Sequence, residues 1–145
     1  MKWYFDTTVL VAAAVSAHPH HGPALNKLEE LARGKHEGFL SAHGLTEVYS
    51  VLTRTPFRPP VYPSEALRII EDEILGPLKL VSLDAREYVR IVRRAGDEGW
   101  IGGRIHDAVH LQCALKMDCD RVYTFNVADF RALAPKELVA RIAAP

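Results

Sequence analysis

The feature that most constrains the fold is an alternation of short apolar runs with longer segments of helical periodicity, which recurs along the chain. Residues 2–5 form the first run, which ends at Asp6, and further runs lie at residues 37–41, 78–81 and 121–124. Between these runs, apolar residues recur at the three- and four-residue spacing of amphipathic helices. Strands that alternate with helices pair in parallel, with helices on both faces of the sheet. We therefore expect a three-layer α/β/α sandwich around a mostly parallel sheet.

Residues that start or stop helices refine this prediction. Thr7 and Thr8 are expected to cap the first helix, Asp84 is expected to cap a later one, and Gly34 is expected to end the second. Residues 55–63 hold four prolines and predict a rigid connector. The predicted helices cover residues 9–15, 25–33, a segment from about 43 to 52, 64–75, 84–96 and 104–117, with a helical turn from 129 and an ambiguous segment at 138–142.

Length and composition bound the class of protein. A chain of 145 residues is ordinary for one compact domain, and we expect a single domain over residues 1–145. No apolar run reaches the roughly 20 residues of a membrane span, and a carboxylate at position 6 comes too early for a signal peptide, so we expect a cytoplasmic protein. Cys113 and Cys119 are expected to be free, buried thiols. The formal net charge is zero, so any contact with nucleic acid must be local.

Acidic and amide side chains collect where the predicted strands end. In open parallel sheets the functional crevice lies outside the carboxyl ends of the strands. Asp6 ends the first strand, Glu47 and Asp107 lie in the first turns of two helices, and Asn126 and Asp129 follow the strand at 121–124. Each acid alone has a structural explanation, because helix N-termini favour carboxylates by about 0.3 to 1 kcal/mol. Their convergence on one edge, which we call the acidic rim, indicates a functional site.

Several carboxylates in one pocket repel one another, so such a cluster requires protonation or a cation. Ligation by oxygen alone, with no histidine or thiolate required, suits Mg²⁺ or Mn²⁺, which also accept phosphate oxygens as ligands. One or two such ions activate water and stabilise the charge that develops on a phosphate. The acidic rim therefore favours hydrolysis of phosphodiester bonds.

Four segments of the chain together resemble the PIN domain, and specifically the toxin nucleases of VapBC toxin–antitoxin systems. They are residues 5–10, 41–48, 105–108 with the small Gly102 and Gly103 before them, and 123–130. The resemblance implies a five-stranded parallel sheet, Mg²⁺-dependent endoribonuclease activity, a homodimer, and inhibition by a small antitoxin protein. It also implies that Thr124 and an acidic or amide residue complete the pocket. Many relatives have aspartate where this chain has Asn126, so Asp129 is a second candidate for that place.

Other histidines offer weaker candidate sites. His106 and His110 are four residues apart on one predicted helix, a spacing compatible with a transition-metal site, but no third ligand at suitable spacing accompanies them. His106 fits better as a residue lining the groove. The histidines of residues 18–21 lie in a predicted turn between helices, where a solvated loop or the start of the second helix is a simpler explanation than a metal site, and we assign them no role.

Charged and aromatic residues near the acidic rim have two interpretations each. Arg54, Arg58 and Arg104 flank the predicted rim, where guanidinium groups suit phosphate recognition and solvent-facing charge is the equal alternative. Trp100 stands between glycines and is expected to anchor its loop rather than to stack on a base.

Two rival functions stay open. An aspartate-based phosphatase or phosphotransfer domain also places an aspartate after its first strand, but it generally needs a second one two positions on, where this chain has Thr8. A noncatalytic binding module of the same fold is compatible with Asn126 and with the zero net charge. The identity of the RNA, the number of ions and the choice between Asn126 and Asp129 are open at this point.

Overall fold

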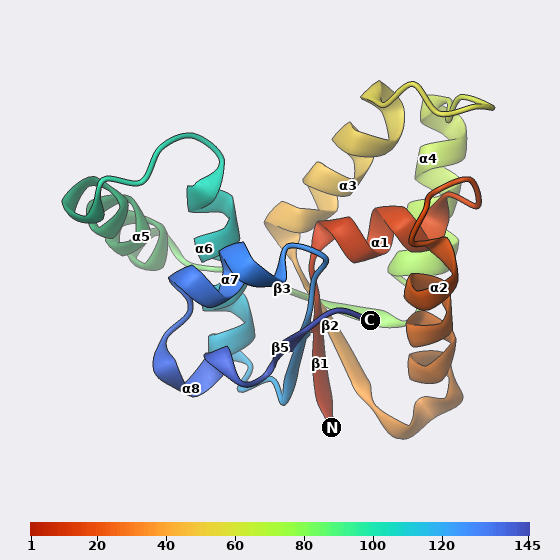
Figure 1. Ribbon diagram of the computed structural model, residues 1–145. Coiled ribbons are helices and arrows are strands. Elements are labelled where there is room, and N and C mark those ends of the chain that lie inside the picture. The colour runs from red at the N-terminus through yellow and green to blue at the C-terminus, as the bar shows by residue number, and fades with distance from the viewer.

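The computed structural model describes all 145 residues and contains one five-stranded sheet with strand order β3-β2-β1-β4-β5. Every neighbouring pair of strands is parallel, so all the carboxyl ends lie at one edge, the upper edge in Figure 1. The expected three-layer sandwich with a parallel sheet is confirmed. The strands are β1 (Lys2–Phe5), β2 (Glu37–Ser41), β3 (Leu78–Val81), β4 (Arg121–Tyr123) and β5 (Ile142–Ala143).

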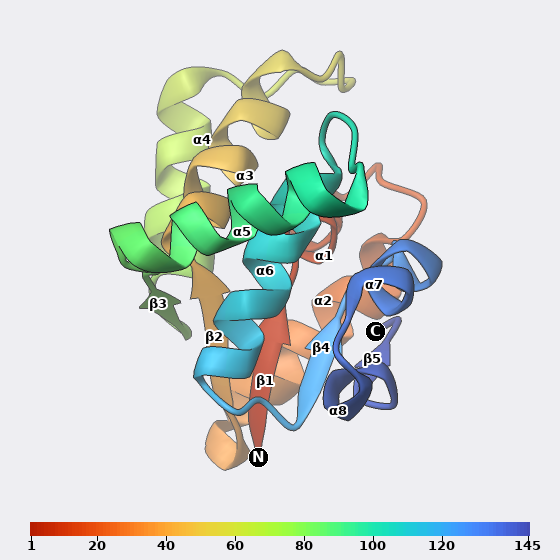
Figure 2. The same ribbon diagram turned by 90° about the vertical axis from the view of Figure 1, so that its left-hand side faces the viewer.

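Helices cover both faces of the sheet, and the two layers stand on either side of it in Figure 1. Within the second layer, α5 crosses the outer side of α6 (Figure 2). The first layer contains α1 (Thr7–Ala14), α2 (His21–Glu30) continued by the wider turn η1 (Leu31–Lys35), α3 (Ala42–Arg54), and α4 (Pro63–Ile69) continued by η2 (Ile70–Ile74). The second contains α5 (Ala85–Glu98), α6 (Arg104–Lys116), α7 (Val127–Leu133) and α8 (Lys136–Val139).

Alternation along β1 divides the interior into two apolar cores. Trp3 and Phe5 face the first helical layer, where a cluster of 19 buried residues gathers. Tyr4 faces the second layer and its cluster of 16 buried residues. Because successive side chains of a strand point to opposite faces, Asp6 continues the face of Tyr4 as the strand ends. The strand therefore carries an aromatic hydroxyl and a carboxylate towards the same layer.

The structure confirms most predicted boundaries and corrects one cap. Asp84 forms a capping box with Glu87, and Gly34 adopts a left-handed φ of 80° near the end of η1. Thr7 and Thr8 do not cap α1, because the helix already begins at Thr7 and Asp6 is its N-cap residue.

Three further expectations concern the end of the chain and its cysteines. The ambiguous segment at 138–142 contains both the end of α8 and the start of β5. Helix α7 begins at Val127, two residues before the predicted turn. Cys113 and Cys119 are both free and buried.

No helix combines the length and the apolar character that crossing a membrane requires.

Candidate active site

Four helices begin at the carboxyl ends of the strands and bring the predicted residues to one edge. Asp6 and Asn126 are the N-cap residues of α1 and α7, and neither side chain makes a capping hydrogen bond. Asp107 and Asp129 lie in the first turns of α6 and α7. Glu47 projects from α3 towards α6, where His110 contacts it. Capping therefore does not explain Asp6, whereas Asp107 and Asp129 keep the first-turn positions that favour a carboxylate.

Asp6 is buried, with 3% of its surface exposed, and hydroxyl groups hold one of its oxygens. Oδ2 accepts hydrogen bonds from the hydroxyls of Thr8 and Thr124, each at 2.8 Å. The Thr124 hydroxyl in turn accepts from the backbone N–H of Asn126 at 3.0 Å. Oδ1 lies 3.5 Å from Nε2 of His110. The carboxylate is therefore fixed in orientation, with one oxygen engaged and the other directed at the acidic rim.

Glu47 is half-buried and is held by the imidazole of His110. His110 Nε2 donates to Glu47 Oε1 at 2.8 Å, and Nε2 of His43 lies 3.7 Å from the same oxygen. Desolvation opposes ionisation of Glu47, but the hydrogen bond from His110 and the charges of His110 and His43 hold the pKa of this glutamate below its usual value. Burying a glutamate without a partner is costly, and the partner of Glu47 is a histidine on α6.

A buried chain of hydrogen bonds determines which way His110 faces. The backbone N–H of Ser41 donates to the Tyr4 hydroxyl at 3.1 Å, which leaves the hydroxyl proton for His110 Nδ1 at 2.6 Å. Burial raises the pKa of Tyr4 well above its usual value, so the phenol keeps that proton. With Nδ1 as the acceptor, Nε2 carries the proton that His110 donates to Glu47.

The fold makes room for His110 at the start of α3. A Cβ atom at Gly44 would lie 2.8 Å from Cε1 of His110 and 2.7 Å from Cδ1 of Leu40, which is closer than side chains approach. Burial alone would lower the pKa of His110, but the hydrogen bond with Glu47 and the charge of Asp6 raise it. In either charge state Nε2 carries a proton, so the contact with Glu47 is kept.

Asp107 differs from Asp6 and Glu47 because it has no hydrogen bond or ion pair, and from the exposed Asp129 because it is half-buried. Desolvation and the negative charge of Asp6 raise the pKa of Asp107 to about 6, with further contributions from Asp129 and Glu47, while His110 acts in the opposite direction. No hydrogen bond is among the causes of the shift. Asp107 is therefore a half-buried carboxylate that faces like charges.

Asn126 and Asp129, the two candidates for the last position, are both exposed. The charge of Asp129 is close enough to contribute to the raised pKa of Asp107. Asn126 is tied to the site through its backbone N–H, which bonds Thr124, rather than through its side chain.

The candidate transition-metal pair of His106 and His110 is not formed. Both nitrogens of His110 are engaged by Tyr4 and Glu47, whereas His106 stacks on His43, with 3.0 Å between Nδ1 of His106 and Nε2 of His43. Trp100 packs against the second core, as expected of an anchor, and the guanidinium of Arg94 lies 4.9 Å from its ring centroid.

Of the three arginines that were expected to flank the acidic rim, only Arg104 does so, as the first residue of α6. Arg54 is the last residue of α3, and Arg58 lies in the connector beyond it. The reason is the length of α3, whose 13 residues carry the chain about 20 Å from the sheet edge at 1.5 Å per residue.

Sequence reasoning missed Tyr4, Thr8 and the bond that His110 makes to Glu47. Two spacing signals were available. Tyr4 precedes Asp6 by two residues, which places both on one face of a strand, and His110 follows Asp107 by three, which places both on one face of a helix.

The donor atoms of the acidic rim decide whether it suits a divalent cation. No three His, Cys, Asp or Glu side chains converge closely enough to enclose an ion as they stand, because the imidazole of His110 lies between Asp6 and Glu47. The oxygens without a hydrogen-bond partner belong to carboxylates, the donors that Mg²⁺ and Mn²⁺ prefer. The donor set thus fits a hard cation in kind, and Asp107 is the half-buried carboxylate of the rim that makes no hydrogen bond or ion pair.

Comparisons with known proteins assign the chain to a family. A PIN domain family model matches residues 3–135. Ribonuclease VapC40 of Mycobacterium tuberculosis is 33% identical over 104 residues, which cover 72% of each chain. Ribonuclease VapC27 of the same species is 30% identical over 105 residues, covering 72% of this chain and 70% of its own.

Solved structures agree at the level of the fold. M. tuberculosis VapC20, described as a sarcin–ricin loop cleaving toxin, has a TM-score of 0.67 at 19% identity, covering 90% of this chain and 93% of its own. VapBC2 from Rickettsia felis, bound to a DNA fragment from its promoter, has a TM-score of 0.62 at 19% identity, covering 88% of this chain and 90% of its own. With the family match and the two ribonuclease relatives, these observations show that the chain belongs to the PIN domain family of VapC ribonucleases.

Proposed function

We propose that this protein is a toxin of the VapC type, an endoribonuclease that hydrolyses RNA phosphodiester bonds with a divalent cation at the acidic rim. The observation that carries the proposal is Asp107, a desolvated carboxylate that faces Asp6, Glu47 and Asp129 without a hydrogen bond to relieve the repulsion. A cation is the simplest source of that relief, since a purely structural site would pair or cap such a group.

The residues that would hold Mg²⁺ or Mn²⁺ are Asp6, through the Oδ1 that the threonines leave free, and Asp107. When bound, such an ion activates water for attack and neutralises charge on the phosphate and the leaving oxygen. Glu47 supplies a further negative charge, and because His110 engages its Oε1, Oε2 is the oxygen left for the site. Thr8 and Thr124 keep Asp6 in one orientation.

For the last position we propose Asp129 rather than Asn126. The support is electrostatic, because the charge of Asp129 reaches Asp107, whereas Asn126 contributes its backbone N–H to Thr124. We further propose that the active protein is a cytoplasmic homodimer controlled by a cognate antitoxin protein. Support for the antitoxin comes from the likeness to VapBC2, whose structure includes the partner protein that its name denotes.

The test is RNA cleavage by the purified protein, free of any antitoxin, with Mg²⁺ or Mn²⁺. Total RNA is incubated with the wild type and with the Asp6→Asn and Asp107→Asn variants. We expect the wild type to produce discrete fragments, chelation of the metal to stop cleavage, and each variant to cut at least about a hundredfold more slowly, because transition-state charge loses its stabilisation.

Asp97→Asn is the matched control, because it removes an exposed aspartate on α5, in the second helical layer. This variant should cut like the wild type. Cleavage that survives in both site variants would point to a contaminating nuclease and overturn the proposal. A folded wild type that cuts no RNA would instead favour the noncatalytic binding module.

A further inference from the structure

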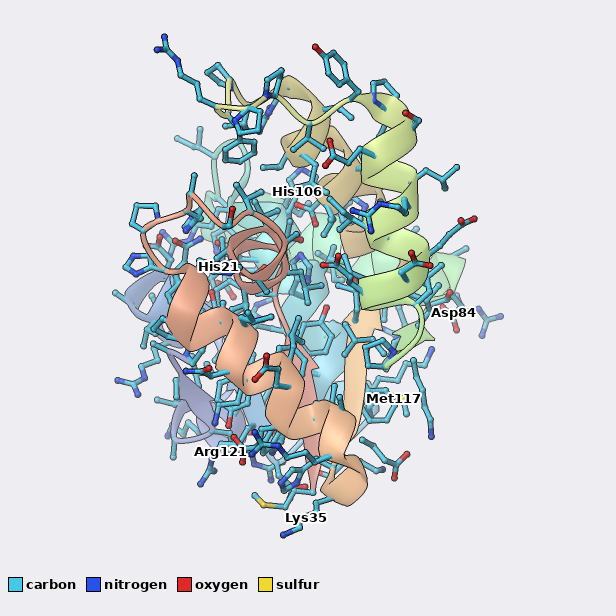
Figure 3. All side chains as sticks on the ribbon, turned by 90° about the vertical axis from the view of Figure 1, so that its right-hand side faces the viewer. His21, Lys35, Asp84, His106, Met117 and Arg121 are labelled. Carbon is cyan, nitrogen blue, oxygen red and sulfur yellow. The ribbon has the colours of Figure 1, made fainter.

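The histidine-rich turn between α1 and α2 is held in place by its own side chains. His18 Nδ1 accepts a hydrogen bond from the backbone N–H of His20 at 3.1 Å. His21 Nδ1 donates to the carbonyl oxygen of Ala12 in α1 at 3.0 Å, and Figure 3 shows His21 beside that helix. These bonds fix the turn at two points, so the turn has a defined shape.

This turn places an aromatic ring over the loop that follows β4. The imidazole of His20 stacks on the ring of Phe125, with 4.5 Å between centroids and 18° between planes. His20 is exposed, while Phe125 is half-buried and packs against the first core. A firmly seated ring therefore carries a second, solvent-facing ring.

A cavity of about 310 Å³ opens beside the two rings. This volume lies at the lower end of the range of small-molecule sites, about 300 to 1,000 Å³. Its walls combine apolar and polar side chains from α1, α3, the histidine turn and the loop after β4. The lining includes Val11, Val51 and Phe125 on the apolar side and Thr8, His18 and His20 on the polar side.

A single hydroxyl connects this cavity to the acidic rim. Thr8 Oγ1 donates to Asp6 Oδ2 at 2.8 Å and accepts from the backbone N–H of Phe125 at 3.2 Å. The Phe125 backbone and the Asp6 carboxylate thus lie on either side of one oxygen atom. A group bound in the cavity would be next to any phosphate at the acidic rim.

We infer that the cavity is a base-binding subsite, which takes one unpaired nucleobase of the RNA next to the phosphate that is cut. This inference rests on the proposed function. Aromatic side chains bind bases of single-stranded RNA by stacking, and every base offers a flat face. Because the chain has zero net charge, its affinity for RNA must come from local contacts of this kind.

An apolar side chain from a protein partner is the competing occupant. Such a side chain would use the walls formed by Val11, Val51 and Phe125, and it would gain little from the polar, exposed ring of His20. A base would stack on the outer face of His20, which Phe125 supports from the other side. The contribution of His20 therefore separates the two occupants.

The test uses a single-stranded oligoribonucleotide that carries the fluorescent base 2-aminopurine, whose emission falls when it stacks. All proteins carry Asp107→Asn so that the RNA stays intact, which a gel verifies, and Mg²⁺ is present. We expect binding with quenching, about tenfold weaker binding in His20→Ala and in Phe125→Leu, and recovery in His20→Tyr, which restores a flat ring. Tyr88→Ala on α5 is the control and should bind like the parent.

Two outcomes would overturn the inference: a parent protein that binds without quenching, or His20→Ala binding as tightly as the parent. His20 is exposed, so its variants test the idea even if Phe125→Leu fails to fold. Cleavage by proteins without the Asp107 substitution separates the two proposals. Cleavage with an unchanged KM in His20→Ala would refute the subsite alone, whereas quenching without any cleavage would refute the nuclease alone.

Discussion

Two of the three aspartates of the acidic rim, Asp6 and Asp107, are held by the protein in opposite ways. On the side of α1 and β4, Asp6 is buried and accepts two hydroxyl hydrogen bonds, and one of those hydroxyls also satisfies a backbone N–H. On the side of α6, Asp107 faces like charges, and desolvation with these charges raises its pKa to about 6. The protein itself supplies the hydrogen bonds that hold Asp6. The charge of Asp107 needs a cation or a proton to neutralise it.

This difference is what a site for an exchangeable cation requires. If hydrogen bonds or ion pairs satisfied every carboxylate of the rim, none would be left to bind a metal. If no carboxylate were held in one orientation, the ion would not be positioned. The comparison also separates stability from function: groups around Asp6 should stabilise the fold, and Asp107 should weaken it until a cation binds.

Of the changes at the two aspartates, the larger effect on stability is expected from Thr124→Val, which keeps the shape of the side chain and removes its hydroxyl. Asp6 would lose one donor and the N–H of Asn126 would lose its acceptor, so the free energy of unfolding should fall by about 1–3 kcal/mol. Urea unfolding measures this change. Thr53→Val, at the outer part of α3, is the control and should change stability by less than about 0.5 kcal/mol. If Thr124→Val and Thr53→Val lowered the free energy of unfolding equally, the hydroxyl of Thr124 would have no special role in holding Asp6.

A smaller effect of opposite sign is expected from Asp107→Asn in metal-free protein at pH 7. The folded-state pKa of about 6 lies above the ordinary 3.8, so the charged form costs stability above pH 6. The cost disappears as the pH falls towards 4. Because Asp107 is only half-buried, removing the charge should stabilise the protein by about 1–2 kcal/mol at pH 7 and by almost nothing at pH 4.

Urea unfolding in EDTA at several pH values measures this difference. A gap between wild type and variant that stays constant with pH would contradict the interpretation of Asp107. Adding Mg²⁺ sharpens the comparison, because ligand at a hundred times its dissociation constant stabilises a folded protein by about 2.7 kcal/mol. The wild type should gain this stability, and Asp107→Asn should gain much less.

The smallest effect on the acidic rim is expected from Tyr4→Phe, which reaches the rim only through His110, although the loss of two buried hydrogen bonds also lowers stability. Without the phenol proton, Nδ1 of His110 loses its donor and Nε2–H is no longer held towards Glu47. Substitution of a residue that orients a ligand commonly costs 10–100-fold, and we expect about tenfold in kcat with little change in KM. Tyr88→Phe is the control. A lower melting temperature with unchanged kcat would show that Tyr4 has only a structural role.

The sequence predicted the fold well because strands and helices alternate clearly along it. Four strands were expected at the places where β1 to β4 occur, and parallel pairing followed from the helices between them. The short β5 was ambiguous, because its two residues carry too little periodicity to identify a strand. The cap at Thr7 and Thr8 was wrong, because the chain has an acidic residue one position earlier that also suits an N-cap.

For the candidate site, the order of the elements brought Asp6, Glu47 and Asp107 to one edge of the sheet, and their roles stay predictions. Sequence alone did not show how each is held. The contacts of His110 with Tyr4 and Glu47 join residues 106 and 63 positions apart, and such pairs arise only when α3 and α6 both pack against the sheet beside β2. The role that we propose for His20 depends on its position over Phe125, which only the folded turn creates.

The sequence by itself determined which acids stand at the carboxyl ends of parallel strands, because strand order and helix spacing are local patterns. Only the tertiary structure decided that Asp6 is bonded on one oxygen while Asp107 has no partner. That distinction depends on burial and on which hydroxyls and imidazoles come within hydrogen-bond distance, and both are set by the packing of helices from opposite ends of the chain.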